Sequence, residues 1–319
     1  MTNHLNDFEA AFKEVQKEIS KVITSGPSLI TGYVSYLTET TGKMMRARAV
    51  LACSMNDDGA IPVDAIKFAA AVEVLHLATL VHDDIMDDAD TRRGQITLQK
   101  RAGKRNAVIC GDFLLAAAIR EISQIADKDI YKSFDFSRYV QSIALGELRQ
   151  NINNRNFRMK VFRYLSIIDG KTAALFEASY HAGALAANYD PHIQKLYRRL
   201  GRYTGIIFQL TDDCIDYENT SETALKPVQS DYENGVVTMP LIHAFEKEPD
   251  LIDKAENNNL TKEEVFEAVK RNNGVEFTHK MAESYYKRAK DILTQLNMPK
   301  EKEEILGGLL TKAFVGLKA

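Results

Sequence analysis

The chain has 319 residues, of which 45% are hydrophobic and 27% charged, so it can bury a sizeable core and is not disordered. Its formal net charge of -3 lacks the basic excess of a dedicated nucleic-acid binder, so we expect no nucleic-acid partner. Only seven prolines and 17 glycines occur, which favours long helices over a sheet-rich fold. Three widely spaced cysteines exclude a disulfide framework and a thiolate zinc site, and they favour a reducing cytoplasm.

Apolar residues recur every three or four positions along most of the chain, which is the period of an amphipathic helix. The first such stretch covers residues 6–24 and ends at the turn formed by residues 25–27. A second helix should start near residue 42. A third runs without a break over residues 62–87, a length of about 39 Å. Its centre is apolar on almost every face, so we expect this helix in the middle of a bundle, without stable membrane insertion because charged residues interrupt it.

The remainder of the chain continues the helical pattern. Further helices are predicted at about 105–125, 137–153, 160–188 and 192–217. Residues 218–234 are expected to form a polar loop, and amphipathic helices with exposed Lys/Glu-rich faces return from about residue 260. No solenoid repeat and no interdomain linker is evident. The sequence therefore predicts one all-α domain that spans residues 1–319.

An acidic motif closes the apolar helix. Residues 83–87 read D-D-I-M-D, so Asp83 and Asp87 are one turn apart on the same face. Like charges at this spacing destabilise a helix unless a cation lies between them. Oxygen-only ligands suit a hard ion such as Mg²⁺, which is readily shared with substrate phosphates.

The same pattern recurs at residues 212–216, which read D-D-C-I-D and end another mostly apolar helix. If the two helices face each other across a bundle, six carboxylates line one cavity, and several Mg²⁺ ions with bound diphosphates would balance their charge. The predicted metal ligands are Asp83, Asp84, Asp87, Asp212, Asp213 and Asp216.

The sequence resembles the trans-type polyprenyl diphosphate synthases, which carry two aspartate-rich motifs. The resemblance covers about residues 40–245 and includes several further motifs in the family's order. These are Gly42-Lys43-Met44-Met45-Arg46, His76, Arg92-Arg93-Gly94, Gly111-Asp112, Gly170-Lys171-Thr172, Phe208-Gln209, Lys226 and Thr238-Met239-Pro240.

The resemblance implies a helical bundle of the isoprenoid synthase type with a central substrate cavity. It implies Mg²⁺-dependent, head-to-tail transfer of an allylic prenyl group to isopentenyl diphosphate, by a homodimer or a heterodimer with a small regulatory subunit. Isopentenyl diphosphate would be bound by Lys43, Arg46, His76 and Arg93, and the allylic diphosphate by Arg92, Lys171, Thr172, Gln209 and Lys226. The six aspartates, Arg92 and Lys171 would be the catalytic set. Val236 departs from short-chain members, which often carry a lysine there.

The resemblance implies that product length depends on residues that precede the first motif. Ala78 and Thr79 are small, at positions where short-chain relatives place bulky aromatic residues, so the path for the growing chain should be open. Its floor should lie deeper, and the candidates are Leu75 with Phe113, Leu114 or Ala117. The sequence therefore predicts long-chain products, around hexaprenyl to heptaprenyl diphosphate.

Other interpretations account for fewer residues. A di-iron carboxylate protein would use Glu73-x-x-His76 and Glu276-x-x-His279, and it leaves all six aspartates without a role. A phosphohydrolase of the His82-Asp83 type leaves the second motif unexplained, and a P-loop fails because Leu165 stands where glycine is required. A non-catalytic subunit and a shorter-chain synthase of the same family are the remaining alternatives. Non-catalytic subunits typically lose motif aspartates, and this chain keeps all six.

Overall fold

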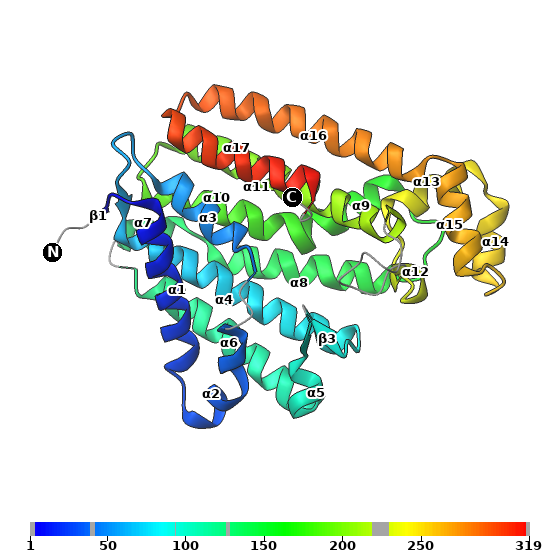
Figure 1. Cartoon of the computed structure of the whole chain (residues 1–319), viewed down its shortest axis with the longest axis horizontal. Coiled ribbons are helices and arrows are strands. Elements are labelled where there is room, and N and C mark those ends of the chain that lie inside the picture. The colour runs from blue at the N-terminus through cyan, green and yellow to red at the C-terminus, as the bar shows by residue number, and fades with distance from the viewer. Residues whose placement is uncertain (1–3, 39–41, 93, 126–127, 219–229, 317–319) are drawn as a thin grey trace. The chain divides into compact units, whose positions relative to one another are not determined.

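The computed structural model describes residues 4–38, 42–92, 94–125, 128–218 and 230–316 (Figure 1). Nearly all regular structure is helical, and the strands form two short antiparallel pairs, β1 with β2 and β3 with β4. The elements are β1 His4–Leu5, α1 Phe8–Thr24, α2 Ser28–Val34, η1 Ser35–Thr38, α3 Met45–Ser54, β2 Ile61–Pro62, α4 Val63–Met86, β3 Thr91–Arg92, β4 Gln95–Ile96, α5 Leu98–Ala102, α6 Lys104–Ser123, α7 Lys128–Ser133, α8 Phe136–Ile152, α9 Val161–Ile168, η2 Asp169–Ala173, α10 Ala174–Ala186, α11 Pro191–Glu218, α12 Ser230–Glu233, α13 Met239–Lys247, α14 Asp250–Glu256, α15 Lys262–Arg271, α16 Gly274–Leu296 and α17 Lys300–Val315.

The predicted all-α fold is confirmed, with three local differences. The predicted helix over residues 160–188 is interrupted by η2, a π-helical turn. Part of the predicted polar loop is helical, because α12 lies within it, whereas residues 219–229 lie outside the described part of the chain. The predicted helix near residue 42 begins at Met45, because Met44 has a left-handed backbone with φ of 43° that cannot continue a helix.

The chain divides into two compact units, and each combines segments that are remote in the sequence. The prediction of a single domain therefore stays a prediction. The first unit comprises Met1–Tyr139, Leu175–Gly201 and Gln295–Leu309. The second unit comprises Val140–Ala174, Arg202–Thr294 and Leu310–Ala319.

Helix α4 is the central helix of the first unit. It packs most extensively against α6 and also contacts α1 and α3 (Figure 1). Among the described residues, only this helix is long and apolar enough to cross a membrane, yet 67% of its most apolar window is buried within the structure. Such burial is typical of the core helix of a soluble protein, so the apolar length of α4 reflects its place in the core.

The close approach of α4 and α6 depends on Gly111. A Cβ atom at this position would lie 2.3 Å from Nε2 of His82, so the imidazole packs directly on the glycine. Any side chain at residue 111 would force the two helices or the ring to shift. The Gly111-Asp112 motif therefore has a packing explanation.

A buried lysine of α17 forms hydrogen bonds with the end of α3 within the first unit. The side chain of Lys302 is fully buried, and Nζ donates to the carbonyl oxygens of Cys53 (2.9 Å) and Met55 (2.8 Å) and to the Tyr189 hydroxyl (2.8 Å). Carbonyl groups at the end of a helix lack intrahelical partners, so the ammonium caps α3 from a remote segment. Burial lowers the pKa of Lys302 to about 8.

The second unit has its own apolar core. Helix α13 contacts α9, α14 and α15. Figure 1 shows α14 and α15 beside α13 at one end of the unit. The core side chains include Phe157, Tyr164, Leu210, Leu241 and Phe245. Helix α15 begins with a capping box, in which Thr261 and Glu264 satisfy each other's backbone amides. This core supports the last two turns of α11, where the second acidic motif lies.

Candidate active site

The first acidic motif occupies the last turn of α4. Its middle aspartate, Asp84, is only 5% exposed, and Nε of Arg92 donates to its Oδ1 over 2.6 Å. Burial raises the pKa of Asp84, and the nearby guanidinium opposes that rise. Asp83 is half-buried and Asp87 is exposed. The structure thus pairs the middle carboxylate with a protein cation and leaves the outer two accessible to ligands.

A pocket with about 410 Å³ of empty volume lies beside the Asp84–Arg92 pair. It combines this ion pair with an apolar wall from α4 and the preceding segments. Its lining residues are Tyr36, Leu37, Leu77, Leu80, Val81, Asp84, Arg92, Gln95, Ile96 and Thr97. A ligand with a charged end and an apolar body fits such a lining.

The basic residues predicted for isopentenyl diphosphate lie at the start of α3 and on α4. Lys43 is exposed, and the half-buried Arg46 places its guanidinium over the Phe176 ring, 4.4 Å from the centroid. His76 is half-buried and lies two helical turns before Asp83, the first residue of the acidic motif, on α4. All of these groups belong to the first unit. Arg93, the fourth residue of this predicted set, lies outside the described residues.

The second acidic motif lies on α11 in the second unit. Its middle aspartate, Asp213, is 5% exposed and receives two neutral donors: the Tyr164 hydroxyl, and Nε2 of Gln209 at 2.8 Å. The Thr172 hydroxyl in turn donates to Oε1 of Gln209 over 2.6 Å. Burial raises the pKa of Asp213 to about 7 in spite of these bonds. The structure therefore brings Thr172, Gln209 and Asp213 together, as the sequence predicted for one site.

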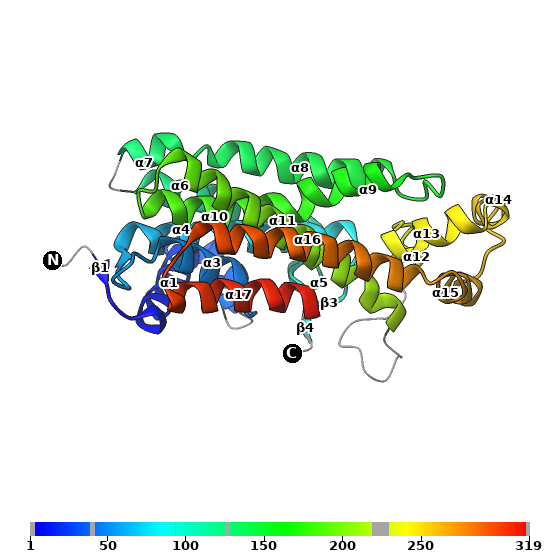
Figure 2. The same cartoon turned by 90° about the horizontal axis from the view of Figure 1, so that it is seen from above.

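Lys171 lies in the π-helical turn η2, and Nζ is 2.9 Å from Oε1 of Glu147 on α8. Two glycines allow this approach, because a Cβ atom at Gly146 would lie 2.1 Å from the amide nitrogen of Lys171, and one at Gly170 would lie 2.9 Å from Cα of Gly146. Figure 2 shows α8 and α9 next to each other at this contact. Single π-helical turns occur frequently at functional sites. Lys226, predicted for the same diphosphate, lies outside the described residues.

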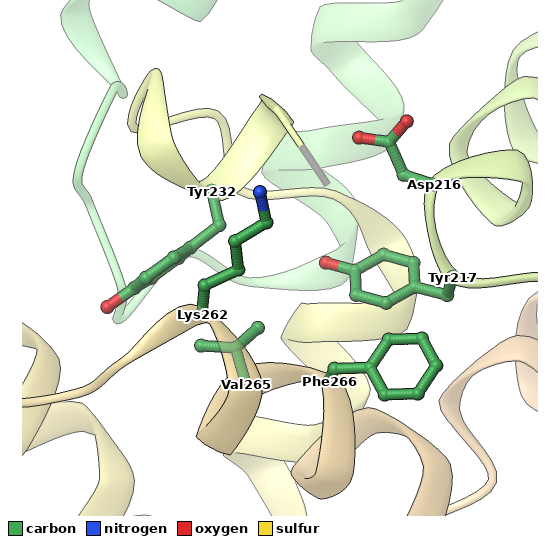
Figure 3. Close-up of a pocket in the computed structure, with 6 residues that line it drawn as sticks. All are labelled: Asp216, Tyr217, Tyr232, Lys262, Val265 and Phe266. Atoms are coloured by element: carbon green, nitrogen blue, oxygen red, sulfur yellow. The ribbon is translucent and has the colours of Figure 1, made fainter. Parts of the chain in front are cut away.

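The outer aspartates of the second motif are half-buried. Oδ2 of Asp216 accepts from the amide of Asp231 over 3.3 Å, and the same carboxylate borders a pocket with about 240 Å³ of empty volume. Figure 3 shows the Lys262 side chain extending between Tyr232 and Tyr217 in this pocket. Lys262 also pairs with Glu233, at 3.2 Å.

The predicted chain-length residues lie on α4 and α6, which pack against each other. Leu75, Ala78 and Leu114 are buried, whereas Thr79, Phe113 and Ala117 are half-buried. The Thr79 hydroxyl donates to the carbonyl of His76, and the Phe113 ring packs on Gly26 at the turn after α1. Their role in product length stays a prediction.

Several residues of these sites could not be identified from the sequence. Tyr164 and Glu147 belong to no motif, and each is remote from its partner along the chain, by 49 and 24 residues. Lys262 lies in a stretch whose charges were interpreted as an exposed face. No signal in a single sequence marks such contacts.

The structure gives other roles to the residues of the rejected interpretations. Oε1 of Glu73 accepts from the amide of Ala47 over 2.9 Å, and Glu276 pairs with Lys280 at 2.7 Å. His82 packs on Gly111 and lies 3.4 Å from Asp112. Among the described residues, no three His, Cys, Asp or Glu side chains are gathered around one metal position.

Comparison with known proteins identifies the family. The model of the polyprenyl synthetase family matches residues 27–272. The chain belongs to the polyprenyl synthetase family. It is 31% identical over 304 residues to heptaprenyl diphosphate synthase component 2 of Geobacillus stearothermophilus, which covers 93% of this chain and 92% of the relative.

Two solved structures of polyprenyl synthetases are similar over almost the whole chain. Heptaprenyl diphosphate synthase from Staphylococcus aureus has a TM-score of 0.88 and 27% identity, with 97% of this chain and 98% of that chain covered. Polyprenyl synthase from Caulobacter crescentus CB15, complexed with calcium and isoprenyl diphosphate, has a TM-score of 0.85 and 28% identity, with 99% of both chains covered.

The predicted isoprenoid synthase type of fold is thus confirmed, and this polyprenyl synthetase is a prenyltransferase that elongates prenyl chains. Mg²⁺ dependence is general in the family.

Proposed function

We propose that the chain adds isopentenyl diphosphate units to an allylic diphosphate primer and releases a long-chain all-trans polyprenyl diphosphate, of hexaprenyl to heptaprenyl length. The observation that carries this proposal is common to both acidic motifs. Each ends a core helix, and each has its middle aspartate, Asp84 or Asp213, buried and hydrogen-bonded within its own unit. The outer aspartates are half-buried or exposed, and we propose that they bind external ligands.

The donor set fits magnesium, because it offers only carboxylate oxygens. We propose the six aspartates as the metal-binding set, with Asp83, Asp87 and Asp212 as direct ligands. Bound Mg²⁺ would neutralise diphosphate charge and so favour departure of pyrophosphate.

The protein's own cations would bind the allylic diphosphate. Arg92 forms an ion pair with Asp84, and Lys171 forms one with Glu147. A diphosphate replaces these anions, and Lys226 adds a third cation. The side chains of Thr172 and Gln209 supply hydrogen bonds to the same group. Because Arg92 and Lys171 are partly buried, their attraction for the leaving pyrophosphate is stronger than at a surface.

The second substrate would be held by Lys43, Arg46, His76 and Arg93. The allylic C–O bond breaks, and the double bond of isopentenyl diphosphate attacks the resulting cation to form one C–C bond. A proton then leaves the new chain for the departing pyrophosphate, so no protein nucleophile is needed. The apolar helices exclude water, which would otherwise capture the cation.

The proposed product length depends on α4. Ala78 is 2% exposed and Thr79 is small, so neither of these two positions places an aromatic ring beside the first motif. We propose that Leu75, with Phe113, Leu114 or Ala117 of α6, forms the floor that stops elongation.

We also propose a cytoplasmic enzyme that acts with a second subunit. Relatives in Bacillus subtilis and Geobacillus stearothermophilus are named component 2 of heptaprenyl diphosphate synthase. A small regulatory subunit is accordingly our first expectation for a partner, and a homodimer is the alternative.

The decisive experiment is chromatography of the products that the purified chain forms from farnesyl diphosphate and labelled isopentenyl diphosphate with Mg²⁺. Hexaprenyl or heptaprenyl diphosphate is the expected product, made with the partner subunit present if the chain requires one. Products that stop at geranylgeranyl diphosphate would support the shorter-chain alternative, to which a geranylgeranyl diphosphate synthase of Sulfolobus acidocaldarius, 33% identical over 309 residues, belongs. Activity that survives in Asp84→Ala and Asp213→Ala variants would contradict the assigned site.

A further inference from the structure

Helix α3 begins without a cap of its own. Its N-cap residue, Met44, has a left-handed backbone and a side chain that makes no capping hydrogen bond. The first amides of a helix have no intrahelical acceptor, and a buried amide left without one destabilises the fold. Another segment must therefore supply an acceptor at this helix start.

Glu73 of α4 supplies that acceptor. Its Oε1 lies 2.9 Å from the amide nitrogen of Ala47, in the first turn of α3. The glutamate is only 6% exposed and Ala47 is fully buried, so water does not compete for this bond. A negative charge is also stabilised by the positive end of the helix dipole. The bond joins two helices through residues that are 26 positions apart in the chain.

The two helix segments joined by this bond carry groups of the same proposed binding site. Arg46 immediately precedes Ala47, and Lys43 lies in the segment just before α3 begins. His76 follows Glu73 by three residues and shares its face of α4. The Glu73–Ala47 bond consequently sets the position of the start of α3 relative to His76.

We infer that Glu73 is a positioning residue for isopentenyl diphosphate. It does not touch the substrate but holds the α3 start so that Lys43 and Arg46 bind the diphosphate together with His76. The inference rests on the proposed function for the assignment of these three groups. It also accounts for the Glu73-x-x-His76 pattern without a metal ion.

Two substitutions test the length of the Glu73 side chain separately from its charge. Glu73→Asp keeps the charge but shortens the side chain by one methylene, which withdraws the acceptor. Glu73→Gln keeps the length and an acceptor oxygen but removes the charge. We expect Glu73→Asp to raise the KM for isopentenyl diphosphate about tenfold, with the KM for the allylic substrate and kcat within about twofold of the unchanged enzyme. Glu73→Gln should stay within about threefold for all three constants.

A larger rise in the KM for isopentenyl diphosphate in Glu73→Gln than in Glu73→Asp would overturn the inference. An equal rise in the KM values for isopentenyl diphosphate and for the allylic substrate would also overturn it. Melting temperatures of the two variants within a few degrees of each other exclude a general loss of structure as the cause.

Two further measurements distinguish failure of this inference from failure of the proposed function. Lys43→Ala and Arg46→Ala should each raise the KM for isopentenyl diphosphate, and unchanged values would overturn the assigned substrate site. Amide hydrogen exchange in the ligand-free protein tests the cap without any substrate. Exchange over residues 45–48 should be faster in Glu73→Asp than in Glu73→Gln and the unchanged chain. Equal exchange in all three proteins would overturn the positioning role.

Discussion

Replacing Lys302 by methionine tests how much the buried ammonium stabilises the end of α3. Methionine has a similar length but no donor, so the carbonyl oxygens of Cys53 and Met55 lose their partner. Each buried acceptor left unsatisfied lowers the free energy of unfolding by about 1–3 kcal/mol. The variant also avoids the cost of burying the charged ammonium, which offsets part of this loss. We expect the free energy of unfolding to fall by about 2–4 kcal/mol.

Urea denaturation at pH 7, followed by circular dichroism, measures this difference. Lys300→Met on the same helix is the matched control, because the Lys300 side chain is 89% exposed and its replacement should change stability by less than about 0.5 kcal/mol. A Lys302→Met variant as stable as this control would refute the capping role.

The pH dependence gives an independent check. The pKa of Lys302 is about 8 in the folded protein, below its ordinary value of 10.5. Between these two pH values, Lys302 binds more protons in the unfolded chain than in the folded chain. The contribution of Lys302 to the free energy of unfolding therefore rises with pH in this range. Below pH 8 both states are protonated and the contribution is constant. The stability difference between the unchanged protein and Lys302→Met should therefore grow from pH 7 to pH 9.5, and a decrease would contradict the assigned pKa.

Three further outcomes are expected. Ala78→Phe should shorten the product while the rate of primer consumption stays within about threefold, as product chromatography would report; unchanged product length would contradict the role of α4. Asp83→Ala and Asp212→Ala should each lower turnover at least about a hundredfold, and excess EDTA should abolish it, so activity that persists under chelation would refute the metal assignment. Gly111→Ala should lower the free energy of unfolding by about 1–3 kcal/mol through overpacking, whereas Gly307→Ala, which meets no atom within 4 Å, should not destabilise the protein.

The sequence predicts α4 to within one residue at each end. Its apolar run begins directly after Pro62 and ends at the acidic motif, so both boundaries have local signals. The same reasoning locates α1 and α11 closely, because their amphipathic patterns are long and uninterrupted. Periodicity is sufficient where one face of a helix is buried along its whole length.

Features that depend on remote contacts could not be predicted. The π-helical turn η2 leaves the local apolar pattern nearly unchanged, and its backbone packs closely on Gly146, 24 residues before Gly170. Lys302 lies in the tail that is predicted to carry exposed Lys/Glu-rich faces, but it is buried because its acceptors come from remote residues, two of them about 250 positions earlier. The motif spacing identified the six aspartates without distinguishing the buried middle residue from its neighbours, because burial depends on partners such as Tyr164.

The contact between Gly146 and Gly170 constrains how this enzyme can diversify. With no Cβ on either side, the two backbones already lie at their minimum separation, and a larger residue at either position moves the backbone of Lys171. Libraries of random variants should accordingly yield inactive proteins from these two positions. Variants with altered products should come instead from α4 and α6, whose side chains can change size while Lys171 keeps its place. Natural or engineered diversification of chain length can thus proceed while Lys171, the cation proposed to bind the leaving group, stays fixed.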